Sequence, residues 1–183
     1  MLNFDMLASP NFVRFVYDGN LDSGLPGPVG GAPEGSGAIE TIFLDYFAAQ
    51  GLPTAPTAFD GRSDYRAFIQ NGIPAGGLFT GAEVRKTAAQ AAVYGGAAGE
   101  QFDPCYHAFC DTLATLDGTP PAIALANPAS AASLAGNGFV GLDQMSDAAA
   151  HATIVLAQST AMLNGERGKG NFNSDEKIAE QAQ

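Results

Sequence analysis

The feature that most restricts the possible folds is the alternation of short apolar runs with helix-like segments. Apolar, β-branched and aromatic residues dominate three strand-like runs, at residues 1–7 (MLNFDML), 12–17 (FVRFVY) and 73–80 (IPAGGLFT). Helix-like segments cover residues 38–50, 63–70, 86–94 and 143–164. Because alternating strands and helices pack as a sheet covered by helices, we expect an α/β fold.

Helical periodicity is clearest in residues 38–50, where Ser36 or Gly37 is suited to begin the helix and Gly51 to end it. One apolar stripe runs along this segment, formed by Ile39, Ile42, Phe43, Tyr46 and Phe47. The shorter helix at 63–70 has Ser63 as its expected N-cap and Asn71-Gly72 as its stop. We expect the long helix at 143–164 to carry His151 in a structural role.

Glycine and proline mark the irregular parts of the chain. Residues 19–37 read as a surface loop inserted between elements, and residues 118–138 have a similar Gly-, Pro-, Ala- and Ser-rich composition. The glycine pair in IPAGGLFT indicates that another group approaches the backbone closely there. We expect residues 1–165 to form one domain portion, followed by a polar, disordered tail at 166–183.

Charge and composition exclude several classes of partner. The 183 residues carry a formal net charge of −11, so neither nucleic acid nor an anionic membrane is an expected partner. No run of 18 apolar residues is present to span a membrane. The chain shows no signal-peptide pattern, although its acidic, lysine-poor composition fits a secreted bacterial enzyme.

The segment FDPCYHAFCD, residues 102–111, concentrates reactive side chains. Cys105 and His107 could act as a thiol nucleophile and its base, although such pairs normally come from distant segments. A zinc clip that includes Cys110 would be cramped and would lack a nearby fourth ligand. A disulfide between the two cysteines is the favoured interpretation, and it would hold Tyr106 and His107 on a rigid loop. His107 would then be either a surface histidine or a metal ligand.

Two other charged residues stand out. Asp5 lies inside an apolar run, where a carboxylate is costly to bury unless it is paired, bound to metal or at the exposed end of the strand. The carboxyl ends of strands are common ligand sites in α/β sheets, which favours a functional role. Arg62, in DGRSD, could present its guanidinium to a carboxylate or carbonyl, or could be a solvated loop residue.

Five segments occur in an order that resembles secreted bacterial two-zinc aminopeptidases of the aminopeptidase S and aminopeptidase Y type. They are LNFDMLASPN, FDGRSDYRAF, NGIPAGGLFTGAE, YGGAAGEQFDPCYHAFCDTL and GLDQMSDAAAHA, and together they span roughly residues 1–160. The resemblance implies a three-layer zinc-exopeptidase fold with a mixed β-sheet flanked by helices. It also implies peptide substrates with a free N-terminus, of which the first residue is bulky and apolar.

The resemblance also implies a role for individual residues. Asp5 matches a ligand of one zinc ion and His107 a ligand of the other, while Tyr106 matches a tyrosine that stabilises the tetrahedral intermediate. Substrate-site positions of the family correspond to Gly61, Arg62 and Phe79, and the family's short disulfide corresponds to Cys105 and Cys110. Asp143 and Asp147 correspond to a pair of residues that binds calcium in some members. Alternatively, they are carboxylates at the N-terminus of a helix, where the helix dipole stabilises negative charge.

The resemblance is incomplete in one respect. The family uses five metal ligands and a catalytic glutamate, and the first three ligands and that glutamate precede the matched region. Two protein ligands cannot hold two zinc ions, because each ion takes about four. We therefore expect a metallo-exopeptidase portion that is inactive by itself, prone to aggregation when expressed alone and secreted in its full-length form. One alternative is a non-catalytic binding module that retains the fold. Another is a cysteine hydrolase, which would require a free Cys105 thiol.

Overall fold

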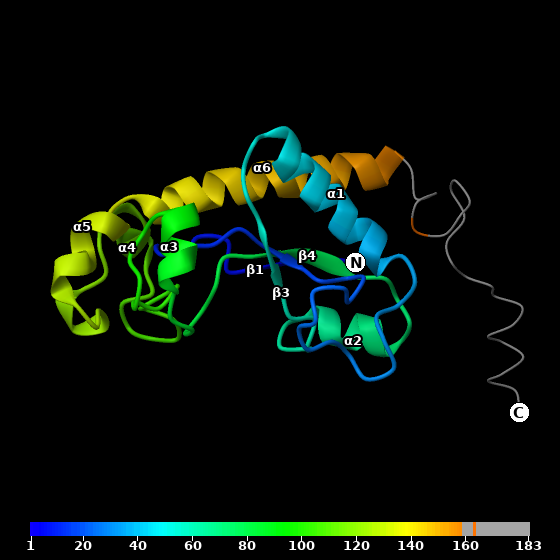
Figure 1. Cartoon of the computed structure of the whole chain (residues 1–183), viewed down its shortest axis with the longest axis horizontal. Coiled ribbons are helices and arrows are strands. Elements are labelled where there is room, and N and C mark those ends of the chain that lie inside the picture. Colours follow the sequence, from blue (N-terminus) through cyan, green and yellow to red (C-terminus); the bar gives the residue numbers. More distant parts are fainter. Residues whose placement is uncertain (159–162, 164–183) are drawn as a thin grey trace, which may run out of the picture.

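The computed structural model describes residues 1–158 and residue 163 (Figure 1). A four-stranded sheet lies at the centre, in the order β1-β4-β2-β3. Its strands are β1 (Leu2–Asp5), β2 (Phe15–Tyr17), β3 (Ala55–Thr57) and β4 (Gly76–Phe79). The sheet is mixed, since β1 pairs parallel with β4 and β2 parallel with β3, whereas β2 and β4 are antiparallel. The predicted α/β class with a mixed sheet is confirmed.

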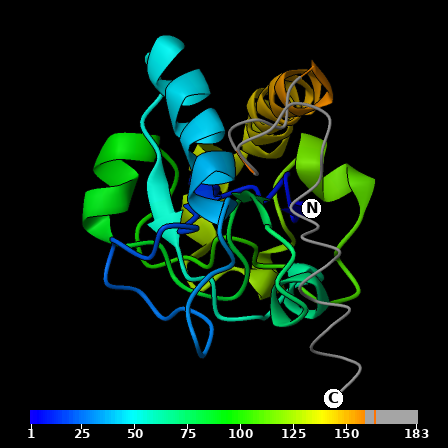
Figure 2. The same cartoon turned by 90° about the vertical axis from the view of Figure 1, so that its right-hand side faces the viewer.

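Helices cover both faces of this sheet. Their bounds are α1 (Ser36–Ala49), α2 (Tyr65–Gln70), α3 (Ala88–Tyr94), α4 (Leu113–Asp117), α5 (Ala131–Leu134) and α6 (Asn137–Gln158), with 3₁₀ turns at Ala122–Ala124 and Pro128–Ser130. In both views α1 and α6 lie on one side of the sheet and α2 lies on the other (Figure 2). Among the described residues, no helix is both long and apolar enough to cross a membrane.

Helix α1 and the sheet form the main core. The predicted stripe is confirmed, because its Ile39, Ile42, Phe43 and Phe47 are buried against Val16 and Leu78 of the central strands. Gly35 precedes the helix in the left-handed region, with φ 91°, and Gly51 follows it with φ 68°. The helix therefore begins at Ser36, two residues before the predicted start.

Strand β4 approaches its neighbours so closely that only glycine fits at two positions. A Cβ atom on Gly77 would lie 1.8 Å from the Asn3 carbonyl oxygen, and one on Gly76 would lie 2.6 Å from the Ile39 side chain. The close approach predicted from the glycine pair is confirmed. These contacts allow β1 and α1 to pack closely against β4. They also fix the register between β1 and β4.

Helix α6 begins at Asn137, six residues before the predicted start at Asp143. Glycines at the beginning of a helix usually indicate a boundary, but here they allow close packing. A Cβ atom on Gly138 would lie 2.8 Å from the Ala8 carbonyl oxygen, and one on Gly141 would lie 3.1 Å from the Phe12 ring. The prediction that this helix reaches Asn164 lies partly outside the described residues. The predicted tail at 166–183 lies entirely outside them.

Several short elements were not predicted as regular structure: strand β3, helices α4 and α5, and the two 3₁₀ turns. Strand β3 contains Pro56, which cannot donate to a ladder, and it is tolerated because β3 is an edge strand. Within the 118–138 segment, the buried Glu100 carboxylate accepts hydrogen bonds from the backbone N–H groups of Ala126 and Asn127 and from the Ser130 hydroxyl. This interaction orders a region whose composition is typical of a loop.

Buried carboxylates also organise the start of the 19–35 loop. Glu40 accepts hydrogen bonds from the N–H groups of Gly19 and Asn20, each at 3.1 Å, and Asp18 accepts from those of Asp22 and Ser23. Burial raises the pKa of Glu40, with a partial offset from the two N–H donors and a smaller rise caused by Asp18 and Asp22. The Gly- and Pro-rich loop is therefore anchored at its beginning.

We predict that the free energy of unfolding of Glu40→Gln increases relative to that of the wild type as the pH rises above 4.5, the ordinary pKa of this carboxyl. A raised pKa in the folded state means that the unfolded chain releases the proton first, so the wild-type free energy of unfolding falls through this range. Urea unfolding of both proteins between pH 4 and pH 7 would measure the difference. Parallel curves over this range would contradict the prediction.

Candidate active site

A cleft of about 670 Å³ lies on the sheet face opposite α1 and α6, because its strand residues alternate with those that pack against these helices. Side chains alternate between the two faces of a strand, so Val16 and Leu78 enter the core while their neighbours face the cleft. Asp5, Phe15, Tyr17 and Phe79 line it from three strands. The cleft therefore combines an aromatic wall with a carboxylate at the end of β1.

Asp5 is the last residue of β1, which ends two residues before the end of the predicted strand at 1–7. Of the alternatives left open for Asp5, the structure supports a position at the strand end. Its Oδ2 accepts a hydrogen bond of 2.7 Å from the Ser63 hydroxyl, and that hydroxyl accepts one of 2.9 Å from the Asn3 amide. Because the amide donates to the hydroxyl oxygen, the hydroxyl hydrogen is directed to Asp5. The prediction of Ser63 as a helix N-cap is wrong: α2 begins after Asp64, and no side chain caps it.

The backbone after Asp5 adopts an uncommon conformation. Met6 has φ 54°, a left-handed value that few residues other than glycine adopt. Its carbonyl oxygen accepts hydrogen bonds from both the N–H and the hydroxyl of Thr80, and Ser9 hydrogen-bonds in turn to that hydroxyl. Buried hydrogen bonds therefore hold the turn that sets the direction of the chain beyond Asp5.

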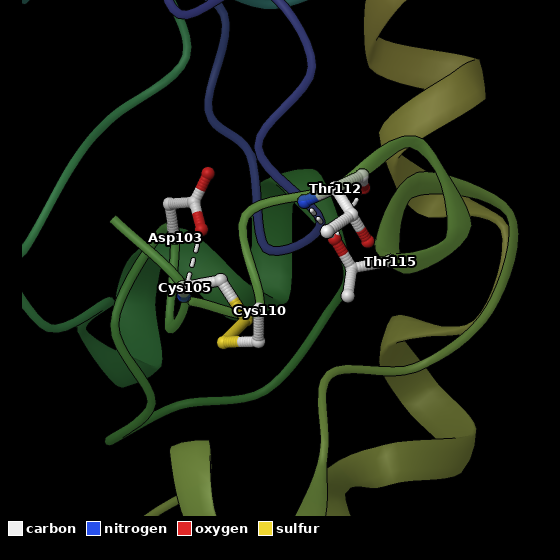
Figure 3. The surroundings of a disulfide bond; sticks show 5 residues. All are labelled: Asp103, Cys105, Cys110, Thr112 and Thr115. Atoms are coloured by element: carbon white, nitrogen blue, oxygen red, sulfur yellow. Dashed lines mark hydrogen bonds between the residues drawn. A yellow bond between two sulfur atoms is a disulfide. The ribbon is translucent and has the colours of Figure 1, made fainter. Parts of the chain in front are cut away.

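A disulfide joins Cys105 to Cys110, as the favoured interpretation of the sequence predicts (Figure 3). Both cysteines are buried, and the Asp103 carboxylate accepts a hydrogen bond of 2.9 Å from the Cys105 N–H. The loop between the cysteines contains a tight turn in which the Ala108 N–H donates to the Cys105 carbonyl at 2.8 Å. The thiol-nucleophile and zinc-clip alternatives are excluded for the oxidised chain.

Tyr106 and His107 lie on this loop, and both line the cleft. Their ring centroids are 4.0 Å apart, and His107 is in the left-handed region with φ 53°. His107 is exposed and Tyr106 is half-buried. The loop closed by the disulfide therefore holds His107 in a strained conformation, at the same cleft as Asp5.

Arg62 forms an ion pair across the cleft wall, with its Nη2 2.8 Å from Oε1 of Glu83. The hydrogen bond to Glu83 raises the pKa of Arg62. The pKa of Glu83 is lowered, first by its own backbone N–H and then by Arg62, with a further contribution from His107. Both members of the pair are therefore ionised at neutral pH, beside the Tyr106–His107 loop.

Neutral aromatic hydroxyls form another part of the cleft. Burial raises the pKa of Tyr17, with additional contributions from Tyr65 and Asp5, and burial raises the pKa of Tyr65 to about 12. Tyr65 accepts a hydrogen bond of 2.8 Å from the N–H of Gly61, whose φ of 85° requires glycine or strain. Gly61 thus positions the backbone next to Arg62.

The structure brings together five of the predicted site residues in one cleft: Asp5, Arg62, Phe79, Tyr106 and His107. Asp143 and Asp147 lie elsewhere, exposed on α6 near the Tyr46 hydroxyl, whose pKa they raise after the larger effect of burial. Their interpretation as helix N-terminal carboxylates is wrong, because the helix begins at Asn137. The His151 ring contacts the Tyr46 ring, with 5.0 Å between centroids and an angle of 35° between the ring planes.

Within the described part of the chain, no three His, Cys, Asp or Glu side chains group closely enough to hold a metal ion. Asp5 and His107 are nonetheless of the types that ligate zinc, and both face the cleft. These residues fit a zinc site as contributors and require ligands beyond themselves.

Comparison with known proteins identifies the family. The model of Peptidase family M28 matches residues 1–128, which carry the whole cleft. The chain belongs to peptidase family M28. This family consists of metallopeptidases.

Three relatives illustrate the similarity. The chain is 53% identical to leucine aminopeptidase 2 of Arthroderma otae over 113 residues, which are 61% of the chain and 22% of that protein. It is 54% identical to the probable lipoprotein aminopeptidase LpqL of Mycobacterium tuberculosis over 121 residues, 64% of the chain and 24% of that protein. The aminopeptidase of Pseudomonas aeruginosa is 51% identical over 117 residues, 63% of the chain and 21% of that protein. The chain therefore matches less than a quarter of these relatives.

We predict that the purified chain contains no free thiol. Alkylation under denaturing, non-reducing conditions should add no mass, and alkylation after reduction should add two alkyl groups, both measured by intact mass spectrometry. A label on Cys105 before reduction would contradict the disulfide and restore the thiol-nucleophile hypothesis.

Proposed function

We propose that this chain supplies one side of the active site of a two-zinc aminopeptidase that removes bulky apolar residues from the N-termini of peptides. The observation that carries the proposal is the convergence of Asp5, Tyr106 and His107 on one cleft beside Phe79. The names of the relatives support the substrate class, since several are leucine aminopeptidases. The proposal concerns the whole protein, because the chain matches only part of each relative.

Each residue has a defined task in this proposal. Asp5 and His107 each hold one zinc ion, and Ser63 orients the Asp5 carboxylate through its hydrogen bond. Bound zinc would polarise the scissile carbonyl and activate a water molecule at neutral pH. The Tyr106 hydroxyl donates to the oxygen that becomes negatively charged in the transition state. Phe79, stacked on Phe15 at 5.9 Å, excludes water and contacts the apolar side chain of the substrate.

Further details belong to the same proposal. The substrate presents a free N-terminus, the full-length protein is secreted, and Asp143 and Asp147 contribute to a calcium site on α6. Calcium takes six to eight oxygen ligands, so the two carboxylates would share the ion with other oxygens. We also propose that residues 1–165 form one unit of the peptidase domain, followed by the tail at 166–183.

A non-catalytic binding module is the second candidate. It is favoured because, in the described part of the chain, no three candidate metal ligands lie close together. Such a module would retain the cleft and bind peptides without hydrolysing them. Calorimetry of peptide binding, combined with an assay for release of the N-terminal residue, distinguishes binding without turnover from catalysis.

We predict that Asp5→Asn and His107→Ala each reduce peptidase activity at least about a hundredfold in the protein translated from the complete reading frame that includes this chain. Both substitutions also reduce bound zinc, measured by atomic absorption after gel filtration. Asp45→Asn on the exposed surface of α1 is the matched charge control and should retain activity. Full activity of either cleft variant would refute the assignment of its ligand.

We predict that Ser63→Ala weakens zinc affinity by about 10- to 100-fold, since it removes the hydroxyl that orients Asp5. Competition with a chromophoric chelator would measure the affinity in the same protein. Ser146→Ala is the matched control, because that hydroxyl bonds only carbonyl groups of its own helix among the described residues. Equal affinities for the Ser63 variant and the wild type would show that Asp5 needs no such support.

A further inference from the structure

Leu25 is an apolar cleft residue in the Gly- and Pro-rich loop that follows β2, and the sequence alone assigned it no role. It lines the cleft together with Tyr17 and Asp5, and it is 40% exposed. Leu21, in the same loop, packs instead against the buried aromatic cluster that contains Tyr17 and Phe59. In the described part of the chain, Leu25 belongs to none of the core clusters. Packing in the core therefore accounts for Leu21 but not for Leu25.

Hydrogen bonds hold the backbone on both sides of Leu25. Its own N–H donates to the Ser23 hydroxyl oxygen at 3.2 Å, and that hydroxyl donates to the buried Asp18 carboxylate. On the other side, the Pro26 carbonyl accepts a hydrogen bond of 3.0 Å from the N–H of the buried Phe59. The side chain of Leu25 is therefore presented to the cleft from a backbone that is anchored before and after it.

The loop also packs on itself next to Leu25. A Cβ atom on Gly27 would lie 2.7 Å from the Leu21 side chain, so the chain just after Leu25 contacts the chain just before it. Leu21 has φ 61°, a left-handed value that few residues other than glycine adopt. Such a conformation persists where the surroundings enforce it. Residues 21–27 therefore form a compact segment that carries Leu25 at the cleft.

A series of contacts places Leu25 relative to the aromatic wall of the cleft. Phe79, which the proposed function sets against the apolar side chain of the substrate, stacks on Tyr17 with 6.4 Å between ring centroids. Tyr17 contacts Phe59 with 6.0 Å between centroids, and the Phe59 N–H binds the carbonyl of Pro26, next to Leu25. Leu25 therefore lies beyond Tyr17, at the end of the wall. An apolar group that extends past Tyr17 would meet Leu25 and remove apolar surface of both from water.

We propose that Leu25 is a specificity-determining residue that closes the apolar pocket and contacts the outermost atoms of the first side chain of a bound peptide. This inference rests on the proposed aminopeptidase function and adds the residue that sets the accepted length of that side chain. A leucine side chain reaches Leu25, whereas the methyl group of alanine ends before it. One methylene group in an apolar pocket changes kcat/KM by about tenfold or more, so this contact separates long from short side chains.

The test uses the protein translated from the complete reading frame and the p-nitroanilides of leucine, alanine and phenylalanine. Leu25→Ala should lower kcat/KM for the leucine substrate by about tenfold and change that for the alanine substrate less than about twofold. The phenylalanine-to-leucine ratio of kcat/KM should rise, because the shortened residue leaves room for the ring. Val29→Ala, at a fully exposed residue of the same loop, is the matched control and should leave all three values unchanged.

Leu25→Phe makes the opposite change. It should shorten the pocket and lower the phenylalanine-to-leucine ratio by about tenfold, while the alanine substrate again changes less than about twofold. Opposite shifts of this ratio in the two variants cannot come from a general loss of folding. Equal losses on the leucine and alanine substrates, or ratios that stay at the wild-type value, would overturn the proposal. Loss of bound zinc from Leu25→Ala, measured by atomic absorption, would also overturn it, since the residue would then support the fold.

The outcome remains interpretable if no substrate is hydrolysed. In that case the aminopeptidase proposal has failed, and calorimetric binding of Leu-Ala-Ala and Ala-Ala-Ala to the wild type and to Leu25→Ala still tests the role of Leu25. A preference for Leu-Ala-Ala in Kd that disappears in the variant supports the contact. An equal preference in both proteins, or none in the wild type, refutes it.

Discussion

The parallel pairing of β1 with β4 is the constraint on which the rest of the site depends. It requires Gly77, because any side chain there would collide with the Asn3 carbonyl, and its register places Asp5 opposite Phe79. Asn3 and Asp5 then share the cleft face, where both reach Ser63. One backbone contact thus fixes the position of the candidate zinc ligand, the hydroxyl that orients it and the aromatic wall beside it.

Two non-glycine residues with left-handed backbone conformations occur at the cleft, and each is held by a different means. Met6 is held by hydrogen bonds from Thr80, whereas His107 lies inside the ring closed by the disulfide. Such conformations persist only where the surroundings enforce them, and they concentrate at functional sites. Both candidate metal ligands, Asp5 and His107, therefore lie at or next to a point where the fold enforces an unfavourable backbone geometry.

Local patterns were sufficient to predict α1, the glycine-mediated approach at β4 and the disulfide. The resemblance of ordered segments grouped Asp5, Phe79 and His107, which the structure places around one cleft. Other features depend on partners distant in the sequence. Ser63 resembles a helix cap in the sequence, but its hydroxyl bonds to Asp5 of β1. The ion pair of Glu83 has no sequence motif, because its partner Arg62 lies 21 residues earlier. The early start of α6 was missed because glycines that break an isolated helix permit contact with Phe12 here.

The contacts that hold the two sides of the cleft differ in sequence separation. The cysteines that hold His107 are five residues apart, so the thiols meet by rapid local closure, with oxidation as the slow step. The turn after Asp5 depends instead on the contact between Met6 and Thr80, which are 74 residues apart, and it forms only when the chain collapses around the sheet. The histidine loop can therefore be cross-linked in a chain that has not folded, and only folding of the sheet brings Asp5 into position beside it.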